Sequence, residues 1–155
     1  MPSSVVRTFT DPDDYASSIR QGTVELTITE RRQFTAKLIG IQFHRLRMQR
    51  FFDNLPRILH VAHVHRRATI SFLAPHRIPQ RWGGTELTPG DVMLHNLDQN
   101  HFQQTSGFAS SGFLSLPVED FVFAGATIVG CDLTPPKAAP NNLLDEERRK
   151  TVAAV

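Results

Sequence analysis

The sequence lacks most of the features that mark secreted and membrane-spanning proteins. It contains one cysteine, Cys131, among 155 residues, so an internal disulfide is impossible and nothing favours secretion. The first residues show no basic segment followed by an apolar run, so we expect no signal peptide. No apolar stretch approaches the roughly 18 residues that a membrane helix requires. These absences predict a cytoplasmic protein that does not span a membrane.

Catalytic and nucleotide-binding motifs are missing as well. The chain contains no G-x-G-x-x-G or Walker sequence, and Ser71 and Ser115 lack the flanking glycines of a nucleophile elbow. The net charge of +2, from 17 basic and 15 acidic residues, is too small to predict nucleic-acid binding by itself. Nothing in the sequence specifies a reaction. We therefore expect a protein that is not an enzyme and that carries no cofactor.

What is present is a sequence suited to a packed β interior. Eleven Phe stand against one Trp and one Tyr, a bias toward purely apolar rings. From Val24 onward apolar and polar residues alternate, as they do in half-buried strands. The phase of the alternation slips at Gly40, which predicts a bulge or bend there. We expect about nine short strands, typical of a sandwich or barrel. The predicted strands cover residues 24–28, 34–48 with a change of phase at Gly40, 58–65, 68–73, 92–94, 101–104 and 112–116. Turns are predicted at residues 82–85 and 88–91.

Helices are predicted at both ends of this β region. Asp11 is a suitable N-cap, Pro12 fits the first helical position, and Gly22 ends the segment. Pro117 opens a second helix over residues 118–127. A Pro-rich linker follows at 133–142, and residues 143–155, with Asn142 as N-cap, have helical character. The sequence thus divides into a β unit with its flanking helix, residues 1–130, and a linker with the start of a C-terminal helix, residues 131–155.

Histidines form the most suggestive cluster. On a strand, His63 and His65 would point to the same face, a spacing that two metal-ligating imidazoles can use, and His101 could supply a third nitrogen. This layout resembles that of metal-binding cupins. However, no acidic residue follows until Glu86, and the adjacent Arg66 would oppose a cation. We expect no bound metal, and a small metal-dependent cupin enzyme remains the alternative.

A basic stretch is formed by Arg45, Arg47 and Arg50 with His44. It could bind phosphate or nucleic acid, but no aromatic interleaving or helix-turn-helix pattern accompanies it. Because these residues alternate with Leu46 and Met48, we interpret them as the solvated face of a strand.

The order of several segments resembles the cupin-like N-terminal domain of AraC-type transcription regulators. The segment LSLPVEDF, within 112–121, is the most telling. The matching stretches are FTDPDDYASSIR at 9–20, FTAKLIGIQFHRLRMQR at 34–50, RWGGTELTPGDVMLHN at 81–96 and GFLSLPVEDF at 112–121. The resemblance implies a jelly-roll barrel whose interior takes a small-molecule effector, followed by helices that pair two subunits. In such regulators a second domain, not contained in these 155 residues, places recognition helices in the DNA major groove.

Under this resemblance the chain is an effector-binding and dimerisation module that contacts DNA only through another domain. Strand parity and position suggest the pocket residues, each of which also suits plain core. They are Phe43, Phe72, Trp82, His95 and Phe113. Apolar residues beyond Pro117 predict a homodimer paired mainly through residues 118–155. Besides the enzyme alternative, a stand-alone interaction protein with a filled barrel stays open.

Overall fold

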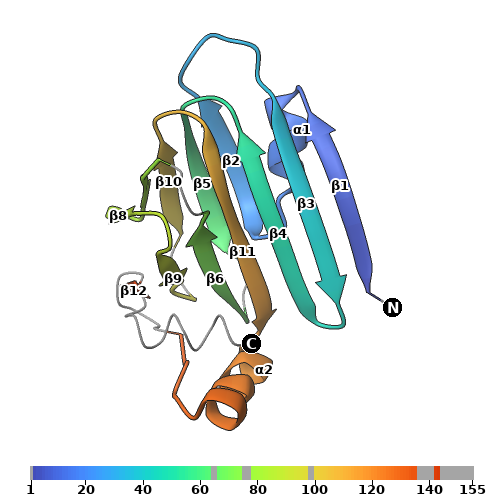
Figure 1. Cartoon of the computed structure of the whole chain (residues 1–155), viewed down its shortest axis with the longest axis vertical. Helices are drawn as coiled ribbons and strands as arrows, with labels where there is room; N and C mark the ends of the chain where they lie inside the picture. The colour runs from blue at the N-terminus through green and yellow to red at the C-terminus, as the bar shows by residue number, and fades with distance from the viewer. Residues whose placement is uncertain (1, 64–65, 75–77, 98–99, 136–141, 144–155) are drawn as a thin grey trace.

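The protein is mostly β and consists of two antiparallel sheets (Figure 1). The computed structural model describes residues 2–63, 66–74, 78–97, 100–135 and 142–143. The strands are β1 (Ser3–Phe9), β2 (Gly22–Ile28), β3 (Ala36–Phe43), β4 (Leu46–Asp53), β5 (Arg57–His63), β6 (Arg67–Leu73), β7 (Gln80–Trp82), β8 (Thr85–Leu87), β9 (Val92–Leu94), β10 (His101–Thr105), β11 (Ala109–Pro117) and β12 (Asn142–Leu143). The helical elements are α1 (Pro12–Ser18), α2 (Val118–Ala124) and the π-helical turn η1 (Gly125–Val129).

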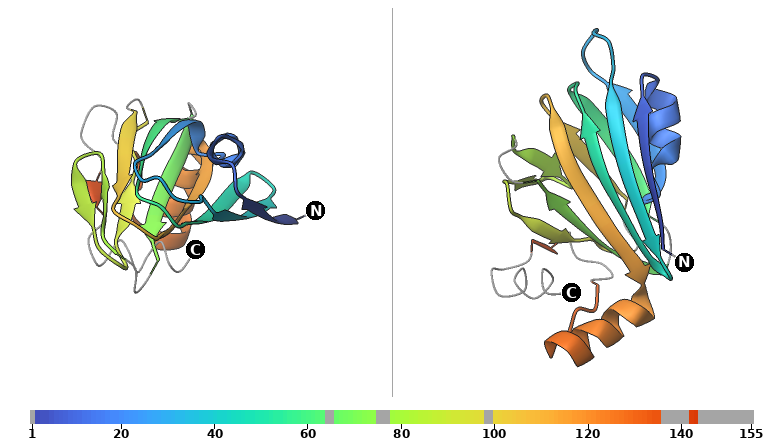
Figure 2. Two further views of the ribbon diagram at one scale, coloured as in Figure 1. Left: turned by 90° about the horizontal axis from the view of Figure 1, so that it is seen from above. Right: turned by 45° about the vertical axis from the view of Figure 1, so that its right-hand side comes forward.

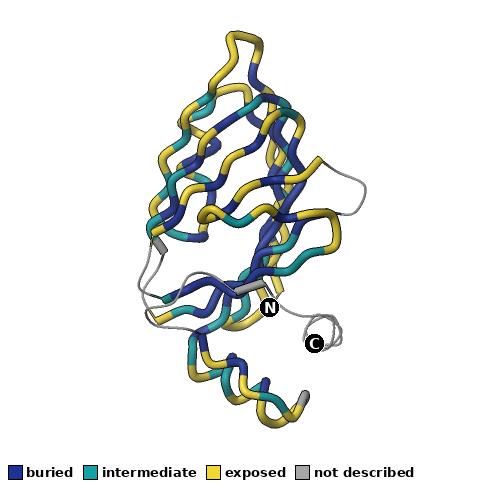
Figure 3. The backbone as a smooth tube through the Cα atoms, turned by 90° about the vertical axis from the view of Figure 1, so that its left-hand side faces the viewer, coloured by how far each residue is buried: buried dark blue, intermediate teal, exposed yellow. Residues whose placement is uncertain are grey.

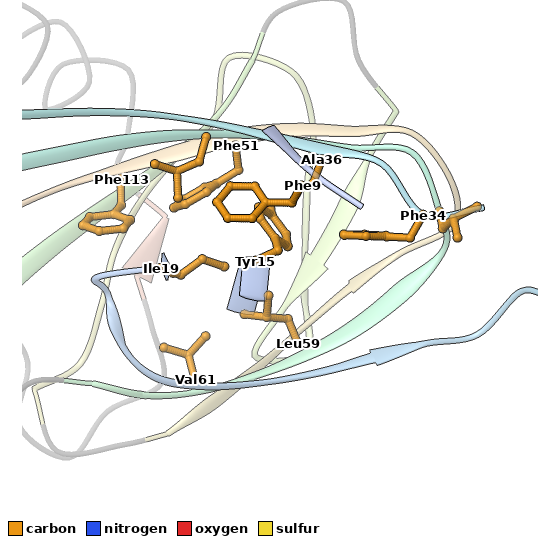
Figure 4. Packing of buried hydrophobic residues seen from close by; sticks show 11 residues of the cluster. Phe9, Tyr15, Ile19, Phe34, Ala36, Phe51, Leu59, Val61 and Phe113 are labelled. Carbon is orange, nitrogen blue, oxygen red and sulfur yellow. The ribbon is translucent and has the colours of Figure 1, made fainter. Parts of the chain in front are cut away.

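The two sheets share one interior. The first, sheet A, has the strand order β1-β3-β4-β11-β6-β9-β12, and the second, sheet B, has the order β2-β5-β10-β7-β8. Leu59 and Val61 of β5 belong to the same buried cluster as Leu38, Phe51 and Phe113 of sheet A. The inner faces of the sheets therefore lie against each other, as the end-on view of Figure 2 and the close-up of Figure 4 show.

Alternating side chains determine which face of each strand is buried. Along β4, Gln49, Phe51 and Asp53 are buried, whereas Arg50 is exposed and Phe52 only half-buried. The same alternation of buried and exposed positions runs through the neighbouring strands (Figure 3). Since successive side chains of a strand point to opposite faces, these strands carry an inner and an outer set of residues.

Helix α1 fills the interior at the β1 edge of the sheets. The Asp11 carboxylate caps it by accepting hydrogen bonds from the backbone N–H groups of Asp13, at 2.8 Å, and Asp14, at 3.0 Å. This confirms the predicted N-cap, although α1 ends at Ser18, before Gly22. Tyr15 and Ile19 project from this segment into the aromatic cluster shown in Figure 4.

Helix α2 packs against sheet A outside the shared interior. Phe121 and Leu133 cover Ala68 and Ile70 of β6, and the turn into η1 brings Gly125 close to Leu133. A Cβ on Gly125 would lie 2.9 Å from Leu133 Cγ, so only glycine fits without displacement. The prediction of a helix opened by Pro117 is confirmed.

Three expectations about elements need correction. The prediction of a bulge at Gly40 is wrong, because β3 pairs with β4 in unbroken register from Ala36 to Phe43. Strand β1 was not predicted, since its first six residues are all exposed and carry no alternation of burial. Asn142 lies in β12, paired with Leu94, and not at a helix N-cap.

The predicted linker and C-terminal helix fall largely outside the described residues. Residues 136–141 and 144–155 belong to this part of the chain. At the start of the predicted linker, Leu133 and Pro135 are buried. Among the residues that the structure describes, no helix is both long enough and apolar enough to cross a membrane.

Candidate functional site

A group of neutral polar side chains joins the two sheets in the interior. We call it the Ser71 cluster and define it as Gln21, Ser71, His95, His101 and Gln103. All five side chains are buried, at 1–5% exposure. Ser71 and His95 belong to the sheet A side, whereas His101 and Gln103 come from β10 of sheet B. Buried polar groups are costly unless they are hydrogen-bonded, so this cluster marks a place that the sequence keeps polar inside a hydrophobic core.

Ser71 is at the centre of the hydrogen bonding. Its Oγ lies 2.7 Å from Nε2 of His95 and accepts a hydrogen bond of 3.3 Å from the Gln21 side-chain amide. His95 itself follows β9, and its backbone N–H donates to the Thr69 carbonyl at 3.0 Å. Both the main chain and the side chain of His95 are thus fixed against β6.

Histidine and tryptophan rings stack beside these hydrogen bonds. The ring centroids of His95 and His101 are 4.5 Å apart, with 21° between the ring planes. Trp82 stacks on His95, with 6.1 Å between the two ring centroids. The Trp82 Nε1–H donates a hydrogen bond to Gln80 Oε1 at 3.0 Å. The three rings thus form a stack with His95 in the middle, beside amide and hydroxyl groups.

A hydrogen bond also joins His101 to Gln103 on the same strand. Nε2 of His101 is 3.1 Å from the side-chain nitrogen of Gln103. The tautomer of the His101 ring determines which role its Nε2 plays in this hydrogen bond. The cluster therefore offers hydrogen-bond donors, acceptors and ring faces, and it contains no Asp, Glu, Lys or Arg.

A second buried polar group, the ionic network, is formed by Tyr15, Asp53 and Arg57. The Tyr15 hydroxyl and Nε of Arg57 each donate to Asp53 Oδ2 at 3.0 Å. Asp53 and Arg57 are at most 2% exposed. Within the described parts of the chain, Asp53 Oδ1 and Arg57 Nη1 have no hydrogen-bond partner.

Burial and charge shift the pKa values in the ionic network. Burial, followed by the negative charge of Asp53, raises the pKa of the Tyr15 hydroxyl well above its ordinary value of 10.0. Burial disfavours the Arg57 cation, but the attraction and hydrogen bond of Asp53, with the charge interaction of Tyr15, outweigh it and raise the Arg57 pKa. Arg57 thus stays charged, and Tyr15 stays protonated well into the alkaline range.

The five predicted pocket residues lie in four different places. Trp82 and His95 lie together in the interior, stacked on each other. Phe113 is fully buried but belongs to the aromatic core, 5.7 Å from Phe51 between ring centroids. Phe43 is 49% exposed at the end of β3, and Phe72 is half-buried beside Gly112. A ligand-binding role stays a prediction for all five, and the structure brings only Trp82 and His95 together.

The predicted metal ligands are described only in part. His101 is buried in the Ser71 cluster, whereas His65 and the side chain of His63 lie outside the described residues. In the portion of the chain covered by the structure, no group of three metal-ligating side chains occurs. His60, which precedes the pair, is half-buried with Nδ1 3.5 Å from Glu25 Oε2 and stacks on Phe102. Metal binding by His63, His65 and His101 remains the alternative hypothesis.

Sequence reasoning missed three members of the cluster, Gln21, Ser71 and Gln103. A signal for Gln103 was present, because it alternates with Phe102 and Gln104 and so shares a face with His101. Phe102, however, is the apolar member of that strand, and it is 60% exposed. An assignment of the inner face by hydrophobicity alone therefore selects the wrong side of β10.

Comparison with known proteins identifies the fold. No protein-family model matches the chain, and no curated protein matches it. Among solved structures, the chain is similar to the crystal structure of the AraC-like transcriptional activator CuxR, with a TM-score of 0.66 and 14% sequence identity. The match covers 98% of this chain and 58% of that chain. At this identity the likeness concerns the fold, and this chain spans little more than half the length of its structural neighbour.

Proposed function

We propose that this chain is the effector-binding domain of an AraC-type transcription regulator, built as a cupin-like jelly roll. The observation that carries the proposal is the Ser71 cluster, a neutral polar and aromatic group held between the two sheets. The fold likeness to an AraC-like activator supports the same assignment. A sensor domain needs a few well-oriented polar groups inside an apolar shell, and the cluster provides them.

The chemistry of the cluster defines the effector class. A flat, polar organic molecule would contact the stack of Trp82, His95 and His101 and exchange hydrogen bonds with the amides and hydroxyl. Because the cluster contains no Asp, Glu, Lys or Arg, this part of the site favours an uncharged moiety. We accordingly place the effector contacts at the Ser71 cluster and at Trp82.

Assembly and DNA binding are part of the same proposal. In a regulator of this type, DNA would be bound by a separate domain, and the present residues 1–130 would form the sensor in a cytoplasmic homodimer. Residues 118–155 are the proposed pairing segment. Within the described part of it, Phe123 of α2 is 69% exposed and Ile128 of η1 is 66% exposed. Such apolar groups on one short segment favour a self-complementary contact between two copies.

A thermal-shift screen with small polar aromatic and heterocyclic compounds tests the effector site. A compound that binds only the folded state raises the unfolding free energy, by about 2.7 kcal/mol at a hundred times its Kd. We expect Ser71→Ala to abolish the stabilisation and Ser106→Ala, at an exposed position, to preserve it. Equal stabilisation of Ser71→Ala would place binding elsewhere, and turnover of the compound would favour the enzyme alternative.

The regulator assignment has its own test. Reading the coding sequence downstream of the codon for Val155 should show a helix-turn-helix domain in the same frame. A downstream catalytic domain would contradict the assignment while leaving the effector site to be judged by the screen.

A further inference from the structure

A hollow of about 300 Å³ lies at one end of sheet A, on its inner face. It is close to the N-terminal end of β1, where β3 ends and β4 begins (Figure 1). The segment that follows α1 forms its remaining wall. The residues that the argument uses are Val5, Arg20, Gly40, Gln42, Arg47 and Gln49.

Arg20 and Arg47 are the charged residues of this hollow, and its lining contains no acidic residue. Neither guanidinium forms an ion pair or hydrogen bond with another described residue. Arg45, in contrast, is paired with Glu119 and Asp120, and Arg57 with Asp53. The hollow therefore contains two cationic groups whose hydrogen-bonding capacity remains available for a ligand.

The sequence had suggested that Arg47 lies on a solvated strand face, and this interpretation is wrong. Arg47 is half-buried and shares the inner side of β4 with Gln49 and Phe51. The charge of Arg47 affects the pKa of Arg67, a nearby cation. Burial lowers the pKa of Arg67 most, the charges of Arg47 and Arg45 lower it further, and those of Asp120 and Glu119 partly oppose this shift.

Two part-buried hydrogen bonds of Gln49 hold the backbone at exposed Arg20 close to the strand that carries Arg47. The Gln49 side chain, 6% exposed, accepts a hydrogen bond of 2.7 Å from the backbone N–H of Arg20 and donates one of 3.0 Å to the Ser18 carbonyl. Gln49 thereby fastens the end of α1 to β4, on which Arg47 lies two residues away. The backbone at both positions is part of a rigid frame.

Gly40 forms part of the floor of the hollow. A Cβ at this position would lie 3.1 Å from Cγ1 of Val5, and 3.9 Å from Cγ of Gln49. A larger residue would therefore crowd Val5 and reduce the space in front of the arginines. A glycine here keeps the hollow open.

We propose that this hollow is an anion-binding pocket, in which Arg20 and Arg47 hold the carboxylate or phosphate group of a small metabolite. Guanidinium groups bind these planar or tetrahedral oxyanions through charge-assisted hydrogen bonds. A volume of about 300 Å³ is at the lower end for small-molecule sites, so the ligand is compact. Val5 in the lining offers apolar contact to its carbon skeleton.

The pocket adjoins the Ser71 cluster but does not depend on it. Arg20 precedes Gln21, whose amide donates to Ser71. A larger hollow at the other end of sheet A lacks the same charge pattern, because its lining combines Lys37 with Asp53. The anion pocket is thus a separate site, and it stands whether or not the Ser71 cluster binds an effector.

The proposal is tested by titrating the isotope-labelled 155-residue chain with citrate, inorganic phosphate and, as an uncharged control, glycerol, while backbone amide NMR signals are followed. We expect saturable shifts at Gly40, Gln42 and Gln49 with at least one of the two anions and none with glycerol. Citrate and phosphate as separate titrations distinguish a carboxylate site from a phosphate site.

Variants define the role of each arginine. Arg20→Gln and Arg47→Gln should each weaken binding by roughly ten-fold to a hundred-fold, the loss of one hydrogen bond to a charged group. Arg50→Gln, on the outer side of β4 with its guanidinium 5.0 Å from the Phe52 ring, makes the same charge change and should leave binding unaltered. Ser71→Ala should also leave it unaltered, so this result is independent of the effector screen.

Three results would overturn the anion pocket. Shifts that never saturate with either anion would do so, as would equal weakening by Arg50→Gln, or shifts confined to residues far from the hollow. Unchanged positions of signals from β5 and β10 in each variant establish that the fold is retained. If one arginine variant fails this check, the other still decides the question.

Discussion

The ionic network and the Ser71 cluster lie between the same two sheets, but they differ in charge and in surroundings. Tyr15 of the network stands within a ring of Phe side chains, 5.5 Å from Phe9 and 5.6 Å from Phe34 between centroids. The Ser71 cluster contains no Asp, Glu, Lys or Arg and is bordered by Trp82 and a smaller apolar group. The first arrangement neutralises a buried charge within the core. The second presents ring faces and amides, which are groups that a ligand can use.

The largest loss of stability in either group is expected from a substitution at Asp53. Asp53→Asn should destabilise the protein by about 3–5 kcal/mol, because it leaves the buried Arg57 cation without its counter-ion. Urea unfolding at neutral pH measures the change, and Asp13→Asn at an exposed position of α1 is the matched control. A loss no greater than in the control would mean that Arg57 has another way to be neutralised.

Ser71→Ala should have the next largest effect, a loss of about 1–3 kcal/mol. The substitution removes the hydroxyl shared by Gln21 and His95 and leaves the Gln21 amide without this buried acceptor. Unfolding in urea, compared with Ser106→Ala, gives the value. If Ser71→Ala proves as costly as Asp53→Asn, the distinction between a structural network and a ligand-binding cluster is lost.

The ionic network should also make the stability of the protein depend on pH in the alkaline range. The pKa of Tyr15 is raised in the folded state, so above the unfolded pKa, near 10, the unfolded chain loses a proton that the folded chain retains. The stability contributed by Tyr15 is complete below this pH and falls by up to about 1.4 kcal/mol for each pH unit above it. Unfolding free energies from about pH 8 to about pH 11 should fall less steeply in Tyr15→Phe than in the wild type. Identical slopes would contradict a raised pKa.

The smallest effect is expected at the exposed ion pairs of Arg45. Arg45→Gln removes contacts of 2.6 Å to Glu119 and 3.0 Å to Asp120 at the start of α2. Exposed pairs contribute little, so the loss should be smaller than for Ser71→Ala. It should vanish in about 1 M NaCl, where the Debye length is about 3 Å. A loss that persists in salt would indicate that Arg45 acts by packing.

Much of the architecture follows from local patterns in the sequence. Alternation places β2, β5 and β6 to within a few residues, the glycines at 83 and 84 mark the β7–β8 turn, and Asp11 fixes the start of α1. These signals are local, because each depends on neighbours in sequence. The sequence therefore predicts the mostly β fold class and many of its elements.

The features that were missed depend on partners distant in sequence. Gly40 reads as a phase slip because Ile41 and Phe43 are exposed apolar residues, and only the partner strands show that the register is regular. The inner position of Arg47 likewise depends on where Gln49 and α1 meet. For the site, Trp82 and His95 were identified by type, but their meeting with Ser71 and Gln103 is a product of the fold of two sheets.

The position of β11 in sheet A has a consequence for how the chain is made. This strand pairs residues 109–115 with β4 and residues 111–117 with β6, so it joins the two halves of its sheet. All strands of sheet B end by Thr105 and emerge from the ribosome earlier. Until β11 follows, the edges of β4 and β6 remain unpaired and open to association with other chains. Pairing over such long sequence separations is slow. We therefore expect the insertion of β11 to limit the rate of folding, and the nascent chain to be most prone to aggregation just before that step.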